Sequence, residues 1–396
     1  MAAGICVVGG SVAGLFAAKM LAMKGFPVDL YDSGDLLEPA GRTLIVTSDF
    51  LKTPDCGFSF IIRNYIHSFQ LISPNNSVNI PLREPDLVVN RADLVKYLLK
   101  EARQAGVRIY VSHRLITAVR TAGGISLQFS DGENEKSVCY GKVIGADGVY
   151  STLARTFGCN GYKKVALLQF PVKLPRDQPS HVTRVWFDRD ITPFFVWLIP
   201  ETPLTGVVGI IAPTMAEARR GLEKFLGGAG LSQEGPPQLG EVPLPPIYPV
   251  PPLSWNPRDV FFVGDAAAQV KATTVGGVVT GIKGAIAACK AIVTGRNYRL
   301  IALPLWRELL IHSVIQRLLE QCGNEDYDFM LTSLNKYGLR VLSKYPRDRL
   351  FQILPLIASS QPNWIILACR LLIKASGISG IKPLLPSVSQ ERKQYS

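Results

Sequence analysis

The sequence predicts an α/β protein in which a nucleotide-binding domain is interrupted by an inserted antiparallel β-sheet and followed by a helical C-terminal region. A strand, a glycine turn and a helix open the chain, and a second unit of this kind begins near residue 260. The stretch between the two units alternates in polarity and contains many aromatic residues. Because the two glycine units match one another and the stretch between them does not, we expect the first domain to be discontinuous.

Composition narrows the class of protein. The chain has 396 residues, of which 47% are hydrophobic and 19% charged, so it can bury a large core without disulfides. Its seven cysteines form no CxxC pair and its four histidines lie far apart, which argues against a disulfide framework and a metal site. We therefore predict a cytoplasmic protein with reduced thiols and no bound metal.

The formal net charge of +12 favours anionic partners. We do not expect nucleic acid among them, because the basic residues form no dense run and no stacking motif accompanies them. Phosphorylated substrates and anionic lipid headgroups remain, together with the alternative that the charge serves solubility alone.

The first glycine unit begins with the apolar strand Ile5–Val8. Its loop consists of Gly9, Gly10, Ser11, Val12, Ala13 and Gly14. This is a GxGxxG pattern with serine in the middle: the first glycine permits the tight turn, the small serine lets the backbone approach a pyrophosphate, and the last glycine lets the helix pack closely on the strand. Asp32 ends the next strand, where an acid can hydrogen-bond a ribose hydroxyl. We predict a Rossmann-like unit that binds a dinucleotide.

The second glycine unit begins with the apolar strand Val260–Val263. The strand leads into Gly264, Asp265 and a turn that includes Val275, Gly276 and Gly277, where a helix starts. The aspartate can accept a hydrogen bond from a ribityl hydroxyl, and the helix start presents free N–H groups and partial positive charge. These features suit the pyrimidine edge of a reduced flavin, so the two units together predict an FAD-binding domain.

Between the two units the chain changes character. We expect residues 33–87 to be irregular with short strands, a helix over Asp93–Ala105 and a strand over Val138–Ile144. Residues 165–215 alternate in polarity, which indicates a β-sheet. Residues 227–252 are rich in glycine and proline and are predicted to be a loop.

These patterns divide the chain into three regions. The predicted FAD-binding domain comprises residues 1–75, 88–160 and 253–298, the β-rich substrate domain comprises 76–87 and 161–252, and the helical region comprises 299–396. The segment Trp364–Ile373 is too short to span a bilayer and is expected to be an amphipathic helix. The C-terminal helices are expected either to pack into the core or to contact a membrane surface peripherally.

Four segments resemble the geranylgeranyl reductase family, whose members are FAD enzymes with the fold of p-hydroxybenzoate hydroxylase. The segments are Val88–Leu94, Gly145–Arg155, Phe195–Pro200 and Gly264–Val278. The resemblance implies that Arg91 and Arg42 lie against FAD, and that Phe195, Trp197 and Pro200 line a substrate pocket. The match is incomplete, because Phe195, Ile199 and Glu201 replace a tyrosine, a phenylalanine and a lysine of the family motif.

The resemblance also implies an activity. Reduced FAD would deliver a hydride to a double bond of a polyprenyl chain in a dry apolar channel. The substrate would be an isoprenoid lipid or a prenyl phosphate, and a separate electron donor, which the sequence does not name, would reduce the flavin. No side chain stands out as the acid for the accompanying proton. Two alternatives stay open: a flavin-dependent monooxygenase or halogenase of the same superfamily, and a flavoprotein without turnover.

Overall fold

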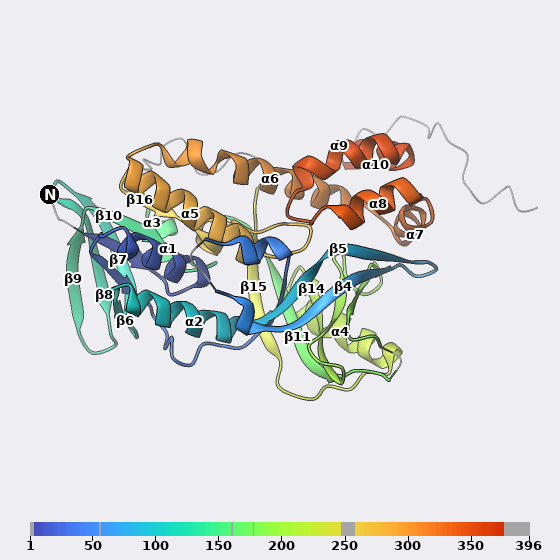
Figure 1. Ribbon diagram of the computed structural model, residues 1–396, viewed down its shortest axis with the longest axis horizontal. Helices are drawn as coiled ribbons and strands as arrows, with labels where there is room; N and C mark the ends of the chain where they lie inside the picture. The colour runs from blue at the N-terminus through green and yellow to red at the C-terminus, as the bar shows by residue number, and fades with distance from the viewer. Residues whose placement is uncertain (1–3, 55–56, 160, 177, 247–257, 376–396) are drawn as a thin grey trace, which may run out of the picture.

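The computed structural model describes residues 4–54, 57–159, 161–176, 178–246 and 258–375, so the predicted boundary at 253 and both chain ends lie outside the described residues. Within them lie a five-stranded, an eight-stranded and a three-stranded sheet, with helices packed around them (Figure 1). The predicted α/β class, with an inserted β-sheet and a helical C-terminal region, is confirmed.

The five-stranded sheet is parallel throughout and carries both glycine units. Its strands, in spatial order, are β16 (Val260–Phe262), β10 (Lys142–Gly145), β1 (Ile5–Val8), β2 (Val28–Tyr31) and β6 (Arg108–Tyr110). Helices α1 (Val12–Met23) and α5 (Val278–Thr294) pack against each other beside this sheet. Because β10 lies between β1 and β16, the turns after Val8, Gly145 and Phe262 meet at one edge of the sheet.

The three-stranded sheet corrects one predicted element. It consists of β7 (Arg114–Thr121), β8 (Gly124–Ser130) and β9 (Glu135–Tyr140). The single strand predicted over Val138–Ile144 is wrong, because the chain leaves this sheet at Tyr140 and enters the parallel sheet at Lys142. The change of sheet matches a change of pattern: β9 is largely exposed, whereas β10 is buried over Val143–Gly145.

The eight-stranded sheet forms the other half of the molecule. Its strands, in spatial order, are β15 (Gln238–Leu244), β11 (Lys163–Lys173), β14 (Thr205–Ala212), β13 (Val196–Pro200), β12 (Val182–Trp186), β4 (Ile62–Ile72), β5 (Ser77–Asn90) and β3 (Thr43–Val46). Alternate residues of its central strands face opposite ways. Val196 and Leu198 pack under helix α4 (Met215–Ala229), whereas Trp197 and Ile199 pack toward the second glycine unit.

Two predictions fail in this sheet. Residues 33–87 are not largely irregular, because β4 and β5 form a long antiparallel hairpin within them. Residues 227–252 are not simply a loop, because β15 pairs with β11 along the edge of the sheet. An edge strand tolerates the proline at Pro243, which would interrupt a central strand. The large sheet thus takes β3 and β4 from the range predicted for the FAD-binding domain.

The C-terminal region is helical, as predicted. It contains α6 (Tyr298–Leu319), α7 (Asn324–Thr332), α8 (Lys336–Lys344), α9 (Leu350–Ser360) and α10 (Pro362–Ala375). Within the described residues, no single helix is long and apolar enough to cross a membrane. The pair Leu350–Ser360 and Pro362–Lys374 reaches that length only together and is bent by 107° between its halves.

Gln269, which is buried, ties the second glycine unit to the helices behind it. Its side-chain oxygen accepts a hydrogen bond from the backbone N–H of Gly264 (2.8 Å), and its amide nitrogen donates to the Tyr298 hydroxyl (3.0 Å). That hydroxyl donates in turn to the carbonyl of Phe262 (2.8 Å). At Gly284 a Cβ would lie 1.8 Å from the Gln269 oxygen, so α5 leaves room for this side chain only by having a glycine there.

We predict that Gln269→Leu lowers the free energy of unfolding by about 2–3 kcal/mol, because it leaves buried polar groups without partners. Gln104→Leu, at the exposed end of α2 (Arg91–Gln104), is the matched control and should change it by no more than about 0.5 kcal/mol. Urea unfolding followed by circular dichroism measures both. Equal losses in the two variants would contradict the structural role of Gln269.

Candidate functional site

The edge of the parallel sheet and the inner face of the large sheet enclose a cleft of about 1330 Å³. Most of the predicted site residues line it: Gly9, Ser11, Val12, Ala13, Asp32, Arg42, Arg91, Phe195, Trp197, Gly264, Asp265, Val275, Gly276 and Gly277. Gly14 and Pro200 lie outside this lining, in α1 and at the end of β13. Residues separated by more than 250 positions therefore meet in one cavity.

The first glycine loop is shaped by close backbone contacts. Gly9 has φ +103°, and a Cβ there would lie 2.3 Å from the carbonyl oxygen of Ala146. At Gly14 a Cβ would lie 2.0 Å from the carbonyl oxygen of Gly9. Ser11 caps α1 by accepting a hydrogen bond from the backbone N–H of Gly14 (3.2 Å). The loop therefore turns sharply, and the N-terminus of α1 points its partial positive charge at the cleft.

Asp32 joins this loop to the end of β2. One carboxylate oxygen accepts a hydrogen bond from the backbone N–H of Gly10 (2.5 Å) and the other accepts from Gly34 (2.7 Å). The side chain lines the cleft beside the loop. It is thus placed to hold the loop and to accept a further hydrogen bond from a hydroxyl in the cleft.

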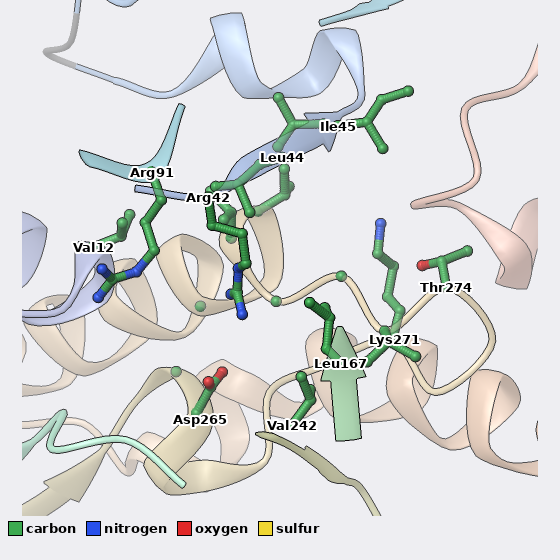
Figure 2. Close-up of a pocket in the computed structure, with 18 of the residues that line it drawn as sticks. Val12, Arg42, Leu44, Ile45, Arg91, Leu167, Val242, Asp265, Lys271 and Thr274 are labelled. Carbon is green, nitrogen blue, oxygen red and sulfur yellow. The ribbon is translucent and has the colours of Figure 1, made fainter. Parts of the chain in front are cut away.

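Two arginines and a buried aspartate form the polar centre of the cleft. In Figure 2 the side chains of Arg42 and Arg91 both extend toward the part of the cleft where Asp265 lies. Burial lowers the pKa of Arg42, an effect that Asp265 opposes, and burial raises the pKa of Asp265, an effect that both arginines oppose. The Nε of Arg42 is buried without a hydrogen-bond partner among the described residues. The two guanidinium groups and the free Nε of Arg42 fit an anionic ligand, and the carboxylate of Asp265 fits a hydroxyl group on that ligand.

The turn of the second glycine unit is strained. Val275 has φ +53°, a left-handed conformation that a β-branched residue rarely adopts and that costs about 1–3 kcal/mol. Two backbone hydrogen bonds hold the turn, from Val275 N–H to the Lys271 carbonyl (2.7 Å) and from Lys271 N–H to the Gly276 carbonyl (3.1 Å). The left-handed conformation of Val275 directs the chain so that Gly276 and Gly277 lie at the start of α5 and line the cleft.

Lys271 is a site residue that the sequence analysis missed. Its ammonium is buried in the cleft wall, where it forms an ion pair with Asp348, which also accepts a hydrogen bond from the Thr47 hydroxyl. Burial lowers the pKa of Lys271, and Asp348 partly opposes this. Burial alone would raise the pKa of Asp348, but Lys271 and Thr47 hold it well below its usual value. In the sequence, Lys271 stands out only as a lysine between apolar residues. Its burial could not be predicted, because the carboxylate that pairs with it lies 77 positions away.

The apolar end of the cleft lies on the inner face of the large sheet. Leu167, Val242, Phe195 and Trp197 line it, and the rings of the last two lie 5.8 Å apart. The indole of Trp197 covers Gly209, where a Cβ would lie 2.3 Å from the ring. Apart from the Trp197 Nε1, the side chains of these four residues carry no polar atom, so this part of the cleft suits an apolar ligand.

Other motif residues hold the fold. Glu201, the acid at the position of the family's lysine, accepts a hydrogen bond from Thr43 (2.7 Å) and pairs with Arg63 (3.2 Å). The carbonyl of Pro200 accepts from the Asn64 amide (3.0 Å). Asp147 accepts from the Ser151 hydroxyl (2.5 Å) at the start of α3 (Thr152–Thr156).

The chain is similar in sequence to known reductases. No protein-family model matches the chain. The geranylgeranyl diphosphate reductase of Synechocystis sp. is 25% identical over 318 residues, which cover 74% of this chain and 76% of the relative. The digeranylgeranylglycerophospholipid reductase 2 of Methanothermobacter thermautotrophicus is 26% identical over 385 residues, which cover 89% and 96%. In sequence, the chain is similar to the geranylgeranyl reductases. The predicted resemblance is confirmed, and the relatives' names agree with the predicted oxidoreductase class.

Solved structures share the fold of this chain. A geranylgeranyl bacteriochlorophyll reductase-like protein from Thermoplasma acidophilum superposes with a TM-score of 0.76 at 19% identity, covering 93% of this chain and 99% of that one. The halogenase PltM in complex with FAD superposes with a TM-score of 0.59 at 14% identity, covering 95% and 96%. At these identities the likeness concerns the fold, which reductases and halogenases have in common.

We predict that Asp348→Asn lowers the free energy of unfolding at pH 7 by about 3 kcal/mol, because it leaves the Lys271 ammonium buried without its anion. The pKa of Asp348 is lower in the folded chain than in the unfolded one. Its contribution is therefore complete above the unfolded pKa of about 3.9 and is lost as the pH falls through the folded pKa. Urea titrations at pH 7 and below pH ~4 should show the variant's deficit shrinking in acid.

The control for this prediction is Glu84→Gln, which removes an exposed carboxylate 3.3 Å from Lys52. Its loss at pH 7 should stay below about 1 kcal/mol. If both variants lost the same free energy, or if the Asp348 deficit did not depend on pH, the buried pair would not contribute as described.

Proposed function

We propose that the chain is an FAD-dependent reductase that saturates double bonds in the polyprenyl chains of isoprenoid lipids. One observation supports this above the others: a single cavity joins a polar end shaped for a dinucleotide to an apolar wall, and a buried lysine also lines it. The names of the sequence relatives agree with this substrate class.

The polar end of the cleft fits FAD, which when reduced supplies a hydride to an unsaturated carbon. The first glycine loop and the start of α1 would hold the pyrophosphate, and Asp32 would accept from the ribose. Asp265 would accept from a ribityl hydroxyl, and the start of α5 at Gly277 would face the pyrimidine edge. The unused Nε of Arg42 would donate to the cofactor.

The apolar end fits a prenyl chain. Leu167, Val242, Phe195 and Trp197 remove its surface from water, at about 0.8 kcal/mol for each buried CH₂ group. The same wall keeps water away from the reacting carbon. Such contacts hold the chain by shape and area rather than by hydrogen bonds, so the wall can accept successive units of one polyprenyl chain.

Lys271 supplies the proton that saturation requires in addition to the hydride. Its Nζ lies in the cleft wall, and Gly276 packs against the end of its side chain, since a Cβ at Gly276 would lie 3.7 Å from Nζ. The lowered pKa makes this ammonium a stronger acid than a free lysine. Asp348 holds the ammonium in place, and the lost proton returns from solvent.

Anaerobic turnover tests the function. The purified holoprotein, reduced with dithionite, should reoxidise when geranylgeranylated phospholipid is added, and mass spectrometry should find one hydrogen pair added for each bond reduced. Chemical reduction removes the need for the natural electron donor. Flavin that stays reduced under these conditions, and reoxidises only with oxygen and an aromatic compound, would instead support the monooxygenase or halogenase alternative.

The proton role is tested by Lys271→Met. We expect kcat to fall by about 10²- to 10⁴-fold with little change in flavin content, because the general acid is lost. Lys290→Met, at an exposed position of α5, is the matched control and should leave kcat unchanged. The double variant Lys271→Met/Asp348→Asn removes both buried charges and separates loss of folding from loss of the acid. Activity near that of the parent in Lys271→Met or in the double variant would exclude Lys271 as the proton source.

A further inference from the structure

Helix α6 has an apolar stripe on its outer side. Leu300, Leu303, Leu310 and Val314 are 38–71% exposed and recur at spacings of three, four and seven residues, which place them on one side of the helix. The opposite side, with Leu305 and Leu309, is buried. An amphipathic helix normally turns its apolar side inward, so a second, outward apolar stripe needs an explanation.

Helices α9 and α10 extend this exposed apolar surface. Large apolar side chains that are 38–58% exposed occur on both: Phe351, Leu354, Leu356, Ile365, Ile366, Leu372 and Ile373. Both helices contact α6, and Figure 1 shows the three along one side of the molecule, away from α4. Nearly half of the large apolar side chains that are exposed in the described part of the chain lie on these three helices. We call this surface the helical face.

Exposed basic side chains lie on the helices of the helical face and on α8, which contacts α9. Between residues 299 and 374, the exposed basic residues are Arg307, Arg317, Lys336, Arg340, Lys344, Arg370 and Lys374. Glu325 is the one acidic residue that is exposed in the same range, all of which is described. Arg307 lies within the α6 stripe, and Lys336, Arg340 and Lys344 follow one side of α8. An apolar surface bordered by cations is complementary to a bilayer that contains anionic headgroups.

The helical face is continuous with the cleft. Leu350 and Ile353 of α9 line the cleft, whereas Phe351 and Leu354 of the same helix are exposed on the helical face. Lys344, at the end of the basic side of α8, also lines the cleft. The cleft that contains the apolar wall is thus also lined by residues of α8 and α9 beside the helical face.

We propose that α6, α9 and α10 dock the protein on the surface of an anionic lipid bilayer, with the cleft opening toward the leaflet. The apolar side chains would enter the headgroup boundary, and the basic side chains would contact lipid phosphates. Docking deepens the proposed function by giving its lipid substrate a path of entry, but the binding itself requires no turnover.

Vesicle flotation with the full-length holoprotein tests this docking. The probe is phosphatidylcholine vesicles with and without phosphatidylglycerol. We expect binding to the anionic vesicles that weakens in high salt. The variant Leu303→Gln/Leu310→Gln/Ile365→Gln/Ile366→Gln should reduce the partition coefficient by about tenfold or more. The control Ile116→Gln/Val119→Gln/Leu204→Gln/Leu239→Gln changes four apolar residues elsewhere that are 46–75% exposed, and it should bind like the parent.

The outcomes separate docking from the proposed function. Circular dichroism and flavin content establish that both variants fold, and detergent-dispersed substrate measures turnover without a bilayer. Vesicle binding that the helical-face variant loses supports docking, whether or not the protein reduces prenyl chains. Absence of binding by the parent, or equal binding by both variants, overturns docking. Self-association of the parent that only the helical-face variant loses would assign the surface to a second copy of the chain instead.

Discussion

The buried ion pair between Lys271 and Asp348 connects the parts of the molecule that enclose the cleft. Lys271 belongs to the turn of the second glycine unit, and Asp348 belongs to the link between α8 and α9. The adjacent Arg347 pairs with Asp86 of the long hairpin. Because a charge removed from water is costly without its partner, these contacts stabilise the packing of the second glycine unit and the long hairpin against the link between α8 and α9. The strained turn at Val275 is held inside this arrangement and so keeps its shape.

The elements that could be predicted from sequence are those whose signals are local. The first glycine loop is read from a strand, a turn and a helix within twenty residues, and the structure places its residues where the close contacts require glycine. The second glycine unit follows the same logic. The hairpin of β4 and β5 was missed because Pro81, Pro85 and several charged residues interrupt the alternation of apolar and polar residues. The hairpin tolerates them because it is partly exposed. Strand β15 was missed because its pairing with β11 joins segments about 75 residues apart, as the registers of Lys163 with Leu244 and Gln169 with Gln238 record.

The candidate site divides in the same way. Arg42 and Arg91 were expected beside FAD only through a resemblance, whereas Asp265 was predicted from the second glycine unit, and the cleft brings the three together. Lys271 could not be ranked from sequence, since a lysine among apolar residues gains its meaning from the carboxylate that meets it. Glu201 reverses the charge of the lysine in the family motif. Its carboxylate accepts a hydrogen bond from Thr43 and pairs with Arg63, so the acid does not disturb the adjoining strand.

The contact between Trp197 and Gly209 limits how this wall can evolve. The two positions are neighbours across β13 and β14, and the ring occupies the space of any side chain at 209. A single change at Gly209 would displace the indole, and a single change at Trp197 would open a void, so we expect the effects of substitutions at the two positions on stability to be coupled. Changes that reshape the apolar wall by one substitution at a time are therefore expected at its other positions, such as Leu167 and Val242.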